Sequence, residues 1–165
     1  MGADGRITGW RAFCKSAALS GQVDLSDPDD AALLHEVYAL LCDMCRAGIY
    51  GISRVYTKEE VEREERLSGG FSFVIETDGF TSFTNNWVEP YVRTLDTSDY
   101  RFGRATHGHQ PDKGPQPTLI AFGPDIRPGA VVERASIVDE PVTVARVLGL
   151  DLGDTDGKVI EGILK

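Results

Sequence analysis

The sequence predicts a mixed α/β fold for this chain of 165 residues. Helix-like and strand-like segments alternate along it. Residues 26–47 place apolar side chains three and four positions apart, behind an acidic start and ahead of Gly48, as an amphipathic helix does. Residues 71–76 and 118–122 are short apolar runs bounded by turn residues, which is typical of strands. The length suits one domain that buries a hydrophobic core.

The composition is ordinary for a globular protein, with 41% hydrophobic and 26% charged residues. The net charge of −9 argues against a nucleic-acid-binding surface, which carries a basic patch. No apolar run approaches the roughly 18 residues of a membrane span. The first ten residues lack the apolar core of a secretion signal, so we expect a cytoplasmic protein without a membrane segment. The three cysteines predict no disulfide framework.

In chain order, residues 6–20 predict a short strand or turn and then one or two helical turns, and residues 22–25 predict a brief strand. The helix over residues 26–47 follows, with His35 on its flank. Residues 49–56 are strand-like. Thr57 and Glu60 form a capping box that begins a charged helix over residues 58–67.

Asp78-Gly79 predicts a hairpin turn between strands at residues 71–76 and 80–84. Glu76 and Asp78 form a carboxylate pair near this turn, either structural or catalytic. Further on, the sequence predicts a buried strand at 118–122, a small strand at 131–132, a helix from 136 to Gly149 capped by Asp139, and a last helix or strand at 159–164.

The candidate site lies in a long segment, residues 86–117, that shows no sustained hydrophobic period. Structureless loops longer than about 12–15 residues in compact domains are usually functional or disordered. This segment holds His107 and His109, separated by Gly108, which permits a close backbone approach. Imidazole is the commonest transition-metal ligand in proteins, but a tetrahedral metal needs three or four ligands. Two interpretations stay open: a metal ligand at a loop rim, or two surface histidines in a turn.

Several segments match the pattern of one known family. They are Thr106-His107-Gly108, residues 117–124 (PTLIAFGP), residues 137–143 (IVDEPVT), residues 148–150 (LGL) and Asp156-Gly157. Together they resemble the C-terminal portion of the type I phosphodiesterase/nucleotide pyrophosphatase family, within the alkaline phosphatase superfamily. The resemblance implies a partial alkaline-phosphatase-like α/β sandwich. Residues 1–165 would then form a single domain, with residues 50–105 as a small α+β insertion.

The resemblance implies that His107 binds one of two divalent metals, most often zinc, through a neutral ring nitrogen. Many relatives have an aromatic residue where this chain has His109, so His109 either contacts substrate or fills the loop. The family's Thr or Ser nucleophile and its other Asp and His ligands have no counterpart here, and the sequence holds no Asp-His pair. The resemblance therefore implies a phosphate-ester or phosphodiester hydrolase in full-length context, inactive as this chain alone.

Two alternatives remain beside this interpretation. The chain is a non-catalytic binding or assembly module derived from the same fold, or a different hydrolase built around Glu76, Asp78 and His107. An alkaline-phosphatase-like sheet that is only partly present exposes an apolar face or edge, so we also expect self-association as a homodimer.

Overall fold

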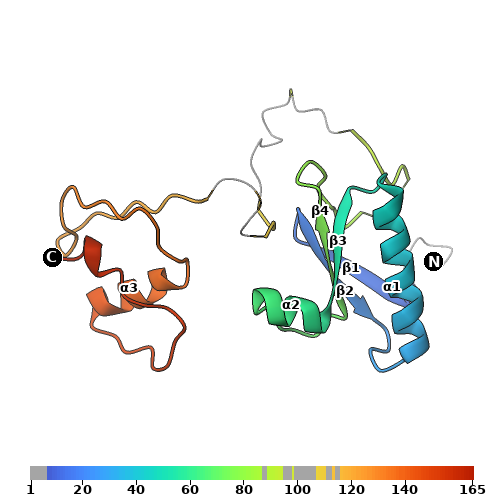
Figure 1. Ribbon diagram of the computed structural model, residues 1–165, viewed down its shortest axis with the longest axis horizontal. Coiled ribbons are helices and arrows are strands. Elements are labelled where there is room, and N and C mark those ends of the chain that lie inside the picture. The colour runs from blue at the N-terminus through green and yellow to red at the C-terminus, as the bar shows by residue number, and fades with distance from the viewer. Residues whose placement is uncertain (1–6, 87–88, 95–97, 99–106, 111–112, 114–115) are drawn as a thin grey trace. The chain divides into compact units, whose positions relative to one another are not determined.

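The computed structural model describes residues 7–86, 89–94, 98, 107–110, 113 and 116–165. Contacts within the chain divide it into two compact units, Met1–Gln116 and Pro117–Lys165. The single domain expected over residues 1–165 stays a prediction. The mixed α/β class is confirmed, with a four-stranded antiparallel sheet and three α-helices in the described residues (Figure 1).

The first unit is built on a four-stranded antiparallel sheet of order β1-β2-β4-β3. Its strands are β1 (Ala12–Ser16), β2 (Ser20–Leu25), β3 (Ile52–Thr57) and β4 (Phe73–Thr77). β4 is an inner strand, paired with β2 through Ser20 opposite Glu76 and with β3 through Val55 opposite Ile75. All five residues of β4 are buried, so β4 is the strand around which this unit packs.

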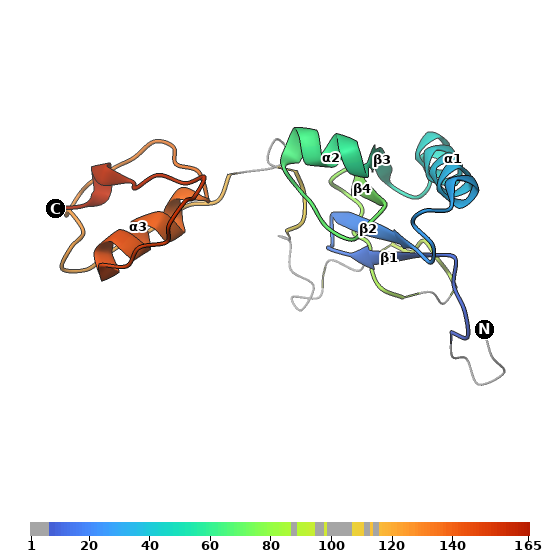
Figure 2. The ribbon, with the colours of Figure 1, turned by 90° about the horizontal axis from the view of Figure 1, so that it is seen from below.

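Helix α1 (Ala31–Ala47) covers one face of this sheet (Figure 2). The Asp30 carboxylate caps it by accepting from the backbone N–H groups of Ala32 and Leu33, and Gly48 ends it in the left-handed conformation. The hydrophobic core beneath it joins side chains of α1, β2, β3 and β4, namely Val23, Leu25, Leu33, Val37, Leu41, Ile52, Phe73 and Ile75. His35 is exposed, as the sequence predicts.

The opposite face of β4 contributes to a second, smaller cluster. Successive side chains of a strand alternate between faces, so Val74 and Glu76 point away from the core that holds Phe73 and Ile75. Val74 packs with Tyr56, Phe71 and Val61, the last from helix α2 (Lys58–Glu65). The predicted capping box of Thr57 and Glu60 begins α2. This face therefore carries a buried carboxylate beside its apolar cluster.

Two elements predicted for the first unit are wrong. Residues 12–25 contain no helical turn but a hairpin of β1 and β2, joined through Ala18 at a φ of 64°. Residues 80–84 do not form a hairpin strand with β4. Both edges of β4 are already paired, with β2 and β3, and Phe83 instead donates its backbone N–H to the carbonyl of Ala18.

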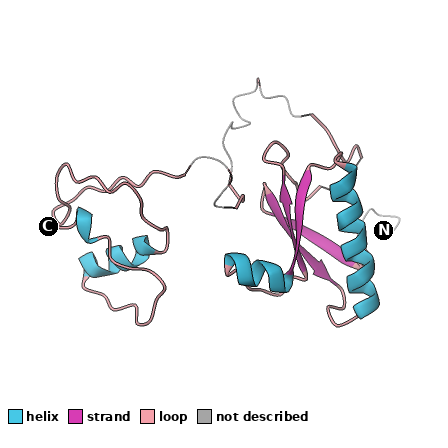
Figure 3. Cartoon of the chain, viewed as in Figure 1, coloured by secondary structure: helices cyan, strands magenta, loops and turns pink. Residues whose placement is uncertain are grey.

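The second unit contains α3 (Asp139–Leu148) and a short 3₁₀ helix, η1 (Glu161–Ile163) (Figure 3). Gly149 ends α3 at a φ of 68°, as predicted. The buried Thr143 hydroxyl donates to the Asp139 carbonyl and accepts from the backbone N–H of Ile160, 2.9 Å away. This bond ties the C-terminal segment to the middle of α3.

Three predictions for this unit are wrong. Residues 118–122 form no strand in the described structure, and Ile120 and Phe122 are 81% and 93% exposed. Residues 131–132 are not a strand either. Asp139 does not cap α3; its carboxylate accepts from the backbone N–H groups of Ser136 and Lys158, at 3.0 and 2.8 Å. Asp139 is the first residue of the helix and joins the segments on either side of it.

None of the helices in the described residues is both long and apolar enough to cross a membrane.

Asp139 gives the second unit a pH-dependent contribution to stability. The two backbone hydrogen bonds, that from Lys158 first, lower the pKa of its carboxyl. A lowered folded-state pKa means that the contribution is complete above the unfolded-state pKa, about 3.9, and is lost as pH falls through the folded value. We expect Asp139→Asn to lower the melting temperature of this unit at neutral pH. The difference in melting temperature from the wild type should close on acidification, as measured by thermal unfolding across pH.

The control is Asp151→Asn, because the Asp151 carboxylate accepts from the backbone N–H of the nearby Gly153. An equal and equally pH-dependent difference in melting temperature in that variant would refute the role assigned to Asp139.

Candidate functional site

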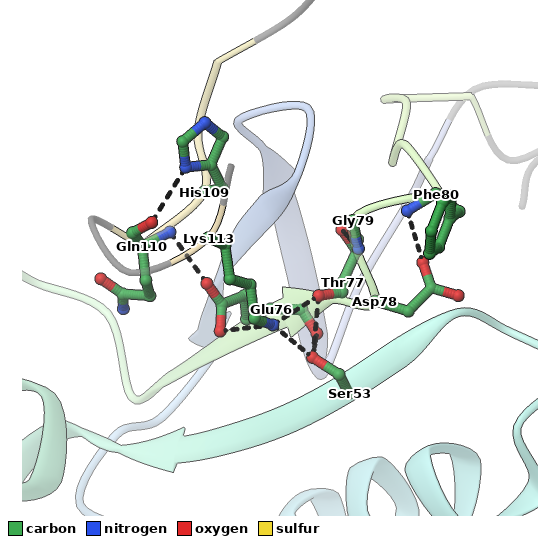
Figure 4. Close-up of polar contacts among 9 residues, drawn as sticks. All are labelled: Ser53, Glu76, Thr77, Asp78, Gly79, Phe80, His109, Gln110 and Lys113. Carbon is green, nitrogen blue, oxygen red and sulfur yellow. Dashed lines mark hydrogen bonds and ion pairs between the residues drawn. The ribbon is translucent and has the colours of Figure 1, made fainter. Parts of the chain in front are cut away.

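The candidate site is centred on Glu76, near the C-terminal end of β4. Glu76 is only 2% exposed. A buried carboxylate is expensive unless it is paired and hydrogen-bonded. The partners of this carboxylate come from the described residues 107–110 and 113, called here the histidine segment. They lie more than thirty positions away along the chain (Figure 4).

Both oxygens of Glu76 contact the segment that follows the histidines. Oε1 accepts from the backbone N–H of Gln110 at 2.8 Å. Oε2 lies 2.9 Å from the Lys113 ammonium, in an ion pair whose carboxylate side chain is 3% exposed and whose lysine side chain is 32% exposed. Figure 4 shows the Gln110 nitrogen and the Lys113 ammonium each meeting one oxygen of the carboxylate. The carboxylate thus attaches the histidine segment to the inner strand of the sheet.

Lys113 reaches two more acceptors at the same place. Its Nζ donates to the Ser53 hydroxyl and to the Thr77 carbonyl, each at 2.8 Å. An ammonium has three donors, and Glu76, Ser53 and Thr77 match that number. Ser53 lies at an irregularity of β3, where the pairing register with β4 shifts between Ile52 and Arg54. Such bulges re-aim a side chain, and here the Ser53 hydroxyl meets the ammonium.

Gly108 contacts the turn between β1 and β2. Its φ is 91°, and a Cβ added there would lie 1.7 Å from the carbonyl oxygen of Ala17. Both observations require glycine, because an L side chain would be strained by the backbone angle and would collide with fixed backbone. The segment is therefore held at two places, at Gly108 by the β1–β2 turn and at Gln110 and Lys113 by Glu76.

His107 lies immediately before the first of these anchor points. Its backbone carbonyl accepts from the N–H of Leu19 at 3.4 Å, while its side chain is exposed. The preceding Thr106 of the family-like motif lies outside the described residues. The imidazole of His107 is thus solvent-accessible on a backbone that is hydrogen-bonded to the β1–β2 turn.

His109 is half-buried, and its orientation is defined by a hydrogen bond. Its Nδ1 lies 2.9 Å from the backbone carbonyl oxygen of Gln110. A carbonyl only accepts, so this contact places a proton on Nδ1, and in the neutral form of the ring Nε2 then carries the lone pair. The same arrangement orients many metal-binding histidines in proteins.

Asp78, the other half of the predicted carboxylate pair, has a local structural role. Its Oδ1 accepts from the backbone N–H groups of Phe80 and Thr81, each at 2.9 Å. Burial raises the pKa of the Asp78 carboxyl, but these hydrogen bonds outweigh it and the net pKa is lowered. Its carboxylate therefore closes the turn after β4, whereas Glu76 holds the histidine segment.

The described residues contain no group of three or more His, Cys, Asp or Glu side chains arranged to hold a metal ion. One imidazole does not retain a catalytic metal. The metal-ligand interpretation of His107 therefore stays a prediction, with no ligand group around it in the described residues. The sequence indicated both histidines and Glu76 but not Lys113 or Ser53, because a lysine in a proline-rich loop and a serine in a strand carry no motif.

The second unit contains an open apolar groove of about 380 Å³. It lies between residues 119–126 and helix α3, and Ile160 and Ile163 also line it. The exposed apolar residues that line it are Leu119, Ile120, Phe122, Val144, Val147 and Leu148.

Comparison with known proteins returned no match, whether with family models, with characterised proteins or with solved structures.

The double anchoring of the histidine segment leads to a test by two glycine substitutions. We expect both Gly108→Ala and Gly79→Ala to pay the left-handed backbone cost of about 1–2 kcal/mol. Gly79 has a φ of 87° and nothing within 4 Å of its Cβ position, so it matches Gly108 in backbone angle alone. Gly108→Ala should lower the free energy of unfolding by at least about 1 kcal/mol more than Gly79→Ala, because its methyl group would push residue 108 away from the β1–β2 turn.

The measurements for this pair are chemical denaturation and hydrogen exchange at the Gln110 amide. Gly108→Ala should accelerate exchange at Gln110, and Gly79→Ala should leave it unchanged. Equal free energies of unfolding and equal exchange rates in the two variants would show that Gly108 is not pressed against the β1–β2 turn.

Proposed function

We propose that this chain is the C-terminal part of a metal-dependent phosphodiesterase or nucleotide pyrophosphatase with an alkaline-phosphatase-like sandwich fold. In this proposal His107 is one ligand of a divalent metal, zinc in the first instance, and the remaining ligands and the nucleophile lie outside the chain. The substrate is a phosphate ester or diester. The chain alone is inactive.

The observation that carries this proposal is the state of the His107 segment. Its imidazole is exposed, while its backbone is fixed through Leu19, Gly108 and the Glu76 carboxylate. A surface histidine in an ordinary turn does not require its backbone to be held by a buried carboxylate on the sheet. A ligand at the rim of a metal centre does, because its nitrogen must be held in place.

In the proposed full-length enzyme the bound metals would activate the hydroxyl nucleophile and stabilise charge on phosphorus. The contribution of this chain is narrower. His107 presents one neutral ring nitrogen, and Gly108 and Glu76 fix the backbone that follows it. His109 lies close enough in sequence to contact substrate, and its Nε2 would accept from a substrate hydroxyl group, not from the phosphate oxygens, which are themselves acceptors.

Two other functions remain candidates. A non-catalytic binding or assembly module is favoured by one observation, that no metal-binding group of three occurs among the described residues. A hydrolase built on Glu76, Asp78 and His107 has less support, because both oxygens of Glu76 are engaged by Gln110 and Lys113 and Asp78 closes a turn.

The first test is an assay of the purified chain with a chromogenic phosphodiester and added zinc. We expect no turnover above background and no stoichiometric zinc. Where the reading frame upstream of Met1 encodes a Thr or Ser nucleophile with Asp and His ligands, the longer polypeptide should hydrolyse the substrate. There His107→Ala should lower activity by at least about 10–100-fold, the range known for changes that only support a ligand.

The matched control for His107→Ala is His35→Ala, an exposed histidine on α1. It should leave both zinc content and turnover unchanged. Turnover by this chain alone that is lost in His107→Ala would refute the proposed inactivity, and tight zinc binding by this chain alone would reveal a ligand set within it.

We further propose that the chain self-associates as a homodimer through the apolar surface of residues 118–122. Phe122 is 93% exposed and Ile120 is 81% exposed. In the described residues no backbone hydrogen bond joins 118–122 to another segment. Exposed apolar side chains on an unpaired extended segment favour pairing with a second chain.

We expect sedimentation velocity to show a dimer for the wild type and a shift towards monomer for Phe122→Asp, because a carboxylate there would be buried unpaired at the interface. Phe80→Asp is the matched control, since Phe80 is an equally exposed phenylalanine of the first unit, at 98%. A wild-type monomer at all concentrations, or equal effects of the two variants, would contradict this interface.

A further inference from the structure

We infer that Glu76 is a positioning residue for His109, and that it holds this imidazole as the Nδ1–H tautomer with Nε2 available to a metal ion. The inference extends the proposed function by assigning a role to His109, and that role as a metal ligand rests on the proposed function. The geometry that carries it involves Glu76, Gln110, Lys113 and His109 (Figure 4).

The first step is the link from the sheet to Gln110. Glu76 Oε1 accepts from the backbone N–H of Gln110 at 2.8 Å. The Glu76 side chain is only 3% exposed. A bond between a backbone N–H and a buried carboxylate is charge-assisted and geometrically restrictive. The backbone of Gln110 is therefore fixed relative to β4.

The second step is the link from Gln110 to His109. The Gln110 carbonyl accepts from Nδ1 of His109 at 2.9 Å and from the backbone N–H of Lys113 at 3.0 Å. This second bond orients the carbonyl that in turn orients the imidazole. A freely solvated neutral imidazole exchanges between two tautomers, whereas this one is held in a single tautomer by its carbonyl partner.

The third step is the contact of Lys113 with the second oxygen of Glu76. Its ammonium neutralises Glu76 and is itself bonded to Ser53 and Thr77 on neighbouring strands. Removing either charge leaves the other charge uncompensated and largely shielded from water. Glu76 and Lys113 thus act together, and neither touches a ligand directly; they act through the backbone of Gln110.

The test is nitrogen-15 NMR of the three imidazoles at about pH 8.5, where an ordinary histidine is neutral. The whole chain is used, as wild type, Glu76→Gln, Lys113→Met and Asp78→Asn. His35, exposed on α1, serves as the internal reference for a solvated imidazole. The buried methyl signal of Val61, in the other cluster of this unit, reports whether each variant is folded.

We expect wild-type His109 to show the Nδ1–H pattern and His35 the mixture of a solvated ring. In Glu76→Gln and in Lys113→Met the His109 nitrogens should shift to the His35 pattern, with accelerated amide exchange at Gln110. Asp78→Asn should match the wild type, because its hydrogen bonds lie in the turn after β4. If Glu76→Gln does not fold, Lys113→Met decides, since Lys113 is a third exposed.

Two results would overturn the inference: a wild-type His109 that matches His35, or a His109 that keeps the Nδ1–H pattern in folded Glu76→Gln and Lys113→Met. Neither result depends on metal or turnover, so the inference can fail while the phosphodiesterase assignment stands. Conversely, a longer polypeptide indifferent to His107→Ala would remove the proposed function and leave the tautomer result intact.

Discussion

The structure of the first unit depends on the burial of one carboxylate. Glu76 lies on the inner strand of an antiparallel sheet, where a charge is stable only if its environment supplies donors. Gln110 and Lys113 supply them from a segment that follows more than thirty positions later. The cost of burying the charge and the placement of residues 110 and 113 are therefore coupled, because the same contacts serve both.

This coupling explains how a segment without regular secondary structure is placed. Its anchor points are the Glu76 carboxylate on β4, the Ser53 hydroxyl on β3 and the β1–β2 turn against which Gly108 lies. The two faces of the sheet have different tasks. The face beneath α1 supplies the core, and the opposite face supplies the apolar α2 cluster and the polar anchor.

Elements with local signals could be predicted from the sequence. The period of α1 and the capping box of α2 act within a few residues, and both helices are present. The predicted start of the first helix at residue 26 is wrong, since α1 begins at Ala31 after its Asp30 cap, and α2 ends at Glu65, not at 67. Predictions that depend on distant partners did worse. Asp78-Gly79 indicated a hairpin, but β2 and β3 occupy both edges of β4. The apolar run at 118–122 indicated a buried strand, yet it has no strand partner in the described residues. Glu76 was noticed, but its ion pair with Lys113 spans a separation that no motif encodes.

The anchor at Gln110 runs through main-chain atoms, and this has a consequence for sequence drift. Glu76 hydrogen-bonds to the backbone N–H of Gln110, and His109 hydrogen-bonds to its backbone carbonyl oxygen, so neither bond involves the Gln110 side chain. Almost any side chain at position 110 preserves both atoms, whereas proline, which lacks the N–H, removes the first. Homologous chains can therefore vary freely at this position, apart from proline, while retaining the same orientation of the neighbouring imidazole.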